Sequence, residues 1–156
     1  MPVPARIKIA REEGYHTDTI GKCEDGRQFM AFVVASMPIG TGRLPGDWRK
    51  RKHWHAVLHT FDKFGNHLNS DIWTAGCTAD GEREVIRRAK SRLSEMLAAL
   101  GSVKYCDVSI SDFHVEVDGR EFGLVDASDP DEDYESIHLL PNDLAFFAPW
   151  DGTYAT

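Results

Sequence analysis

The chain has 156 residues, of which 42% are hydrophobic and 28% charged, proportions that are typical of one globular domain and exclude disorder of the whole chain. No run of apolar residues is long enough to span a membrane. The formal net charge of −7 repels phosphate backbones, so we expect no nucleic-acid partner for the chain as a whole.

The cysteines and the first residues indicate the compartment. Cys23, Cys77 and Cys106 are odd in number and widely spaced, so neither a disulfide framework nor a zinc ribbon is expected. The N-terminus contains no apolar leader segment. We therefore expect a cytoplasmic protein that has no cofactor.

Strand signals dominate residues 6–36. Arg6–Ala10 alternates polar and apolar residues and is predicted to form a first strand. Residues 17–24 and 27–36 are predicted to form a hairpin joined by Asp25-Gly26, a pair that suits a two-residue type I′ turn. Within it, Phe29–Val34 is apolar on both faces, which favours a central strand covered on both sides.

An irregular segment, residues 37–52, follows this hairpin and is rich in proline and glycine. Its second half carries cations around a tryptophan. A solvated loop is the simplest interpretation, but the pattern also suits a surface that binds an acidic partner or a phosphate. The candidate interaction loop consists of Arg43, Trp48, Arg49, Lys50, Arg51 and Lys52.

A second hairpin is predicted from His53 to Thr74, with a three-residue loop that ends at Gly65. In this register Leu58 faces Ser70 and Ala56 faces Ile72, which gives one apolar face for a core. Histidines and an aspartate gather on the opposite face. The candidate ligand or metal face consists of His55, His59, His67 and Asp71.

Imidazoles and a carboxylate on neighbouring strands lie within about 5–8 Å of one another, close enough to share protons or to bind a transition metal. The competing interpretation is a polar sheet face with a structural role. Histidines that stand perpendicular to a sheet do not converge on one ion, so we assign no metal and no catalytic residue.

Residues 80–101 carry the clearest helix signal. Asp80 is a good N-cap residue, and Glu82 and Glu84 complement the helix dipole in the first turn. Apolar residues recur with helical spacing over residues 85–100, and Gly101 is expected to end the helix.

A third hairpin is predicted after the helix. Val108–Ile110 and Phe113–Val117 have opposite parity, and a β-bulge between them would join them in one strand. Asp118-Gly119 is a second two-residue turn signal, which pairs Val117 with Arg120.

The end of the chain combines an acidic connection with an aromatic segment. Residues 127–135 are irregular and acidic, and they can attract the basic loop within one molecule or between two copies. Attraction between copies would produce a homo-oligomer, so this alternative is kept. The aromatic residues of 139–156 predict a tail that docks on the sheet. Together the elements predict one domain over residues 1–156: an α+β fold, a mostly antiparallel meander sheet of hairpins packed against one long helix.

The motifs that announce common enzymes are absent from the sequence. There is no Walker A loop, no dinucleotide-binding glycine motif, no Gly-x-Ser-x-Gly elbow and no His-Glu-x-x-His helix. This favours a non-enzymatic regulatory or protein-interaction module with a protein partner. The alternative is a small-molecule or metal-binding protein, possibly an enzyme, that uses the histidine face.

Several stretches resemble a group of small bacterial proteins described as formate hydrogenlyase regulatory proteins (HycA-like). The resemblance implies a regulatory role and supplies no catalytic or ligand residues. The stretches that carry it are Glu12-Glu13-Gly14-Tyr15 with Thr19-Ile20-Gly21, Ala56-Val57-Leu58-His59 with Phe61-Asp62, Ser70-Asp71-Ile72-Trp73, Phe122-Gly123-Leu124-Val125-Asp126, and Ala148-Pro149-Trp150-Asp151-Gly152-Thr153-Tyr154.

Overall fold

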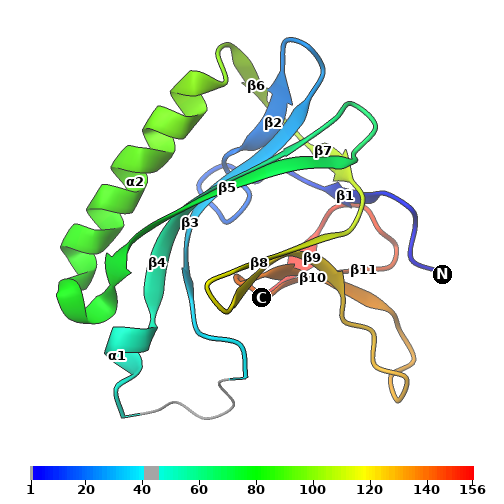
Figure 1. Ribbon diagram of the computed structural model, residues 1–156. Helices are drawn as coiled ribbons and strands as arrows, with labels where there is room; N and C mark the ends of the chain where they lie inside the picture. Colours follow the sequence, from blue (N-terminus) through cyan, green and yellow to red (C-terminus); the bar gives the residue numbers. More distant parts are fainter. Residues whose placement is uncertain (1, 41–45) are drawn as a thin grey trace.

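A computed structural model describes residues 2–40 and 46–156 of the chain (Figure 1). Its helical elements are the short helix α1 (Trp48–Arg51), the 3-10 turn η1 (Thr78–Asp80) and the long helix α2 (Glu82–Ala99). The strands are β1 (Ile7–Ile9), β2 (Ile20–Cys23), β3 (Gln28–Ser36), β4 (His53–Phe61), β5 (His67–Cys77), β6 (Val103–Tyr105), β7 (Val108–Ile110), β8 (Phe113–Val117), β9 (Arg120–Asp126), β10 (Ser136–Leu140), β11 (Leu144–Phe147) and β12 (Tyr154–Ala155).

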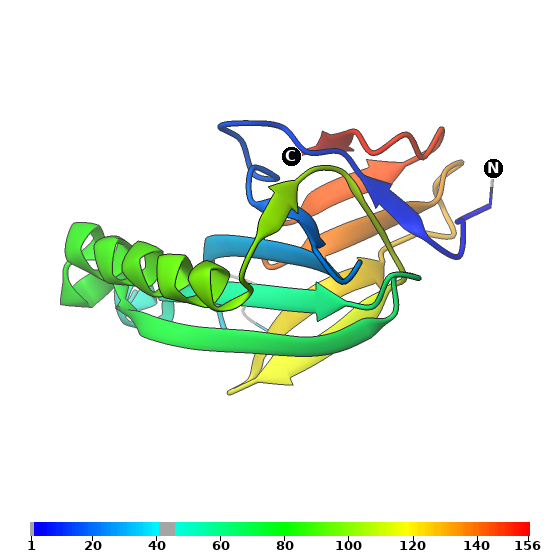
Figure 2. The same cartoon turned by 90° about the horizontal axis from the view of Figure 1, so that it is seen from above.

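The predicted fold class is confirmed: every strand pair is antiparallel and one long helix packs on the sheet strands. The strands do not form one sheet, however. A first sheet has the order β5-β4-β3-β2-β6 and a second sheet the order β12-β11-β10-β9-β8, while β1 and β7 form a separate pair. Helix α2 lies on one side of the first sheet, and the second sheet lies on the other (Figure 2).

Two layers of core follow from this arrangement. Phe29 and Ala31 of β3 pack with Leu93 and Met96 of α2. The alternate residues Met30 and Phe32 belong to the larger core cluster that fills the space between the sheets. The prediction of a central strand covered on both faces is therefore confirmed.

Local turn signals are confirmed at one hairpin and wrong at another. Asp118 and Gly119 have φ of 51° and 72°, and they pair Val117 with Arg120 as predicted. At the first hairpin the backbone N–H of Cys23 donates to Arg27 O, so the loop has three residues, 24–26, instead of the predicted two. Of these residues only Gly26 has a positive φ, whereas a type I′ turn needs two.

The helix begins one residue later than predicted. Gly81 is the N-cap residue, whereas Asp80 belongs to η1 and its carboxylate accepts the backbone N–H of Cys77 at 3.1 Å. The predicted end is confirmed, because Gly101 follows the C-cap Leu100 with a φ of 83°.

The predicted bulge after β7 is a break between two sheets. Ile110 pairs with Ile7 of β1, whereas Phe113 pairs with Leu124 in the second sheet, so the two stretches never share a strand. The docked tail is confirmed, since β11 and β12 are strands of the second sheet. Of the described helices, none has the length and apolar character needed to cross a membrane.

Candidate functional site

The predicted histidine face is placed opposite α2, as expected, but the second sheet covers it. His59 is fully buried and His55 is 2% exposed. The ring of His67 stacks on that of Phe113 from β8, with centroids 4.6 Å apart. These three imidazoles are therefore part of the interface between the sheets, and we call them the histidine row.

Asp71 does not belong to this row, so that part of the predicted site is wrong. The register starts as expected, with Phe61 opposite His67, and then shifts by one residue. A β-bulge at Leu68 causes the shift, and the next pair is Thr60 with Asn69. A shift of one residue moves every later side chain to the other face. Asp71 consequently pairs with Leu58 on the helix side of the sheet and is exposed.

A serine hydroxyl connects two members of the row. Ser70 Oγ lies 2.6 Å from His59 Nδ1 and 2.8 Å from His67 Nε2. One hydroxyl proton can be donated to only one imidazole, so the other ring must donate to the oxygen. The second nitrogen of His59, Nε2, is buried without a hydrogen-bond partner.

His55 is held by a second set of polar groups. Its Nε2 lies 2.6 Å from Ser36 Oγ, and its Nδ1 lies 3.0 Å from Thr74 Oγ1. The buried guanidinium of Arg120 donates to Ser36 O at 2.7 Å and to Ser36 Oγ at 3.2 Å. Ser36 thus links a strand of the first sheet to a cation from the second sheet.

Burial keeps this row uncharged. It lowers the pKa of His55 to about 4, with a further contribution from the nearby Arg120 cation, and lowers the pKa of His59 to about 3. The pKa of His67 is lowered for the same reason. Within residues 2–40 and 46–156, no three or more His, Cys, Asp or Glu side chains are grouped to hold a metal ion. The row is suited to fixing the two sheets in register.

The predicted interaction loop forms the short helix α1, except for Arg43, which lies outside the described residues. The Arg49 guanidinium lies 4.6 Å from the centre of the Trp48 ring. The Lys52 ammonium lies 5.9 Å from the Trp48 ring and 5.0 Å from that of Trp54. Lys50 and Arg51 are exposed on the same turn. Cations thus lie over the half-buried indole of Trp48.

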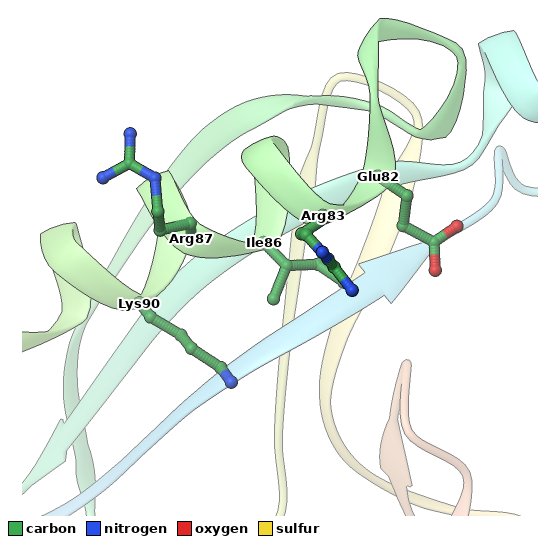
Figure 3. A pocket seen from close by; sticks show the side chains of 5 residues that line it. All are labelled: Glu82, Arg83, Ile86, Arg87 and Lys90. Atoms are coloured by element: carbon green, nitrogen blue, oxygen red, sulfur yellow. The ribbon is translucent and has the colours of Figure 1, made fainter.

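The start of α2 lies beside α1 and adds more cations. The two are joined where the backbone N–H of Thr78 in η1 donates to Lys52 O at 3.0 Å. Figure 3 shows Arg83, Ile86 and Lys90 projecting from one side of α2, where they line a shallow pocket with Glu82 and Arg87. The exposed cations of the two helices form what we call the basic end: Arg49, Lys50, Arg51, Arg83, Arg87, Arg88 and Lys90.

The acidic connection lies elsewhere in the molecule. Five of the nine residues 127–135 are Asp or Glu, and none is Lys or Arg. In Figure 1 this loop, drawn in orange, is on the opposite side from α1 and the start of α2. Charge is therefore separated along the molecule.

Two groups of polar residues were not expected from the sequence. Arg120 is a charged residue that directly follows a turn, yet it is only 5% exposed. Ser136, His138 and Asp143 lie together on the outer face of the second sheet. The spacing Ser136-x-His138 is the sequence signal that could have revealed this group, because alternate residues of a strand share a face. It was not recognised, because these residues directly follow an acidic loop and show no hydrophobic pattern that marks a strand.

Comparisons of the chain with protein-family models, curated proteins and solved structures find no match.

Proposed function

We propose that this protein is a regulatory module that binds an acidic segment of a protein partner through its basic end. The observation that carries the proposal is the half-buried indole of Trp48, flanked by exposed cations, on a protein whose net charge is −7. Tryptophan and arginine are the residues that most often dominate binding energy at protein interfaces. The resemblance to HycA-like regulatory proteins supports a regulatory role, and the three unpaired cysteines accord with a cytoplasmic location.

A protein partner accounts for the charge distribution better than a nucleic acid. A long polyanion would meet the acidic connection as well as the basic end, and the net charge opposes its approach. A protein with a local acidic patch meets only the basic end, and complementary charge then increases the rate of association.

The test compares two triple variants that change the net charge equally. The first, Arg49→Glu with Lys50→Glu and Arg51→Glu, reverses α1. The matched control, Lys22→Glu with Lys63→Glu and Lys104→Glu, reverses exposed lysines on β2, on the β4–β5 turn and on β6. Cross-linking and affinity capture from a bacterial lysate identify the partner, and titration calorimetry with the purified partner measures the affinity.

We expect the first variant to weaken binding about tenfold or more, and the control to bind like the wild type. Equal loss in both variants would indicate only a response to net charge. No loss in the first variant would remove α1 from the interface, and displacement of the partner by duplex DNA would favour the nucleic-acid alternative.

A further inference from the structure

A pocket on the outer face of the second sheet lies apart from the basic end. It has a volume of about 390 Å³ and is lined by residues of β10, β11, β12 and the acidic connection. Its lining residues are Tyr134, Ser136, His138, Ala145, Phe147 and Ala155. Aromatic walls and small alanines give the space for an apolar group, and one imidazole and two hydroxyls supply polar atoms.

Three polar side chains at this pocket form a continuous chain of contacts, from Ser136 through His138 to Asp143. His138 Nδ1 lies 2.8 Å from Asp143 Oδ1, and His138 Nε2 lies 3.5 Å from Ser136 Oγ. Alternate residues of a strand share a face, which places Ser136 and His138 on the same side of β10. Asp143 follows β10 in a turn, where its backbone N–H donates to Leu139 O at 2.7 Å.

The carboxylate fixes the tautomer of the imidazole. Because a carboxylate accepts, His138 donates its Nδ1 proton to Asp143, and Nε2 then carries a lone pair that faces the Ser136 hydroxyl. A hydroxyl, a base and a group that orients the base are the parts of an activated serine nucleophile. Distances between nucleophile and base are often longer before a substrate is bound.

From this geometry we propose that the pocket is an acyl-transfer site that hydrolyses small, uncharged carboxylic esters. Ser136 Oγ forms a bond to the carbonyl carbon while its proton passes to His138 Nε2. The C–O bond to the alcohol then breaks, and the leaving oxygen takes the proton from His138. Water, activated by the same nitrogen, releases the acid and restores the Ser136 hydroxyl.

The lining of the pocket defines the substrate class. Phe147 and Tyr134 are exposed aromatic rings that can contact a short acyl or aryl group. Five carboxylates lie in the connection of residues 127–135 that bears Tyr134, so an anionic substrate is disfavoured. The Tyr134 hydroxyl is a donor of the type that stabilises a developing oxyanion. This activity is independent of the proposed binding through the basic end.

The test is covalent labelling of the full chain with a fluorophosphonate probe, followed by tandem mass spectrometry and by p-nitrophenyl acetate hydrolysis. We expect one adduct, on Ser136, and a loss of hydrolysis of about 100-fold or more in S136A and H138Q. The matched control is H114Q, because His114 lies on the same face of the second sheet and contacts Glu121 at 3.4 Å without a serine partner. It should keep wild-type activity.

Asp143 provides a variant that leaves the core intact, since its side chain is 71% exposed. We expect D143N to slow both labelling and hydrolysis while circular dichroism shows a folded protein. Absence of a Ser136 adduct in the folded wild type, or hydrolysis unchanged in S136A, would overturn the proposal.

Discussion

Ser36 and His55 meet through a hydrogen bond of 2.6 Å at the interface of the two sheets, and Arg120 donates to the same hydroxyl from the opposite side. The contact joins neighbouring strands of the first sheet to a strand of the second. It explains how a histidine and an arginine are tolerated in a core, because both ring nitrogens of His55 and Nη1 of Arg120 find partners there. The histidine row is therefore expected to affect folding more than ligand binding.

Acid should destabilise the protein over a range set by the histidine row. Unfolded imidazoles take up protons below about pH 6.5, whereas in the folded protein burial lowers the pKa of His55 to about 4 and that of His59 to about 3. Stability is therefore complete above about pH 6.5 and falls as the pH drops toward those lower values, by about 1.4 kcal/mol per pH unit for each histidine. Urea unfolding at a series of pH values measures this slope.

The variant His59→Leu should reduce the pH slope by up to about 1.4 kcal/mol per pH unit, because it removes one of the histidines whose pKa is lowered in the folded protein. Ser91→Ala on the exposed surface of α2 changes no titrating group, so it is the control and should leave the slope unchanged. A slope that does not respond to His59→Leu would contradict the assignment.

Ser70→Ala should destabilise the fold by about 1–3 kcal/mol. The substitution removes the hydroxyl between His59 and His67, and buried imidazole nitrogens then lose their partner. Chemical denaturation compares it with Ser91→Ala on the exposed surface of α2, for which we expect a change within about 0.5 kcal/mol. Equal effects of the two substitutions would mean that the hydroxyl does not stabilise the row.

Gly65→Ala should cost more than Gly81→Ala. Both glycines have positive φ, 93° and 100°, so each substitution strains the backbone by about 1–3 kcal/mol. A Cβ on Gly65 would also lie 2.6 Å from Ser109 O, whereas one on Gly81 meets nothing within 4 Å. The difference in unfolding free energy between the variants isolates this clash, and a difference near zero would show that β7 can move away.

Trp48→Ala and Trp54→Ala should separate binding from stability. Trp48 stands on the exposed turn of α1, and its loss should weaken partner binding while stability changes by less than about 1 kcal/mol. The Trp54 Nε1–H donates to Thr78 Oγ1 at 2.9 Å, and its ring packs beside the buried residues of α2. Its loss should cost about 2–4 kcal/mol, as measured by thermal and urea unfolding.

Features set by neighbouring residues could be predicted from the sequence, whereas those set by residues far apart in the chain could not. Asp118-Gly119 specifies its own turn, so the register of β8 and β9 was predictable from two residues. The helix was predictable from spacing alone, apart from its first residue. The division into two sheets was not, because pairing of Ile110 with Ile7 depends on residues far apart in the chain.

The candidate site depended on one residue. Leu68 is apolar, yet it is 54% exposed and lies at the bulge. A hydrophobic pattern does not show which residue of a strand is unpaired. Asp71 was therefore placed on the histidine face, whereas the histidines, which precede or adjoin the turn, were placed correctly.

The position of β3 should protect its backbone amides from hydrogen exchange. This strand is the middle one of its sheet, with α2 above it and the second sheet below. Amide protons of Met30 and Phe32 should exchange with deuterium only when the whole molecule opens, whereas those of β12, at the rim of the second sheet, should exchange through local fraying.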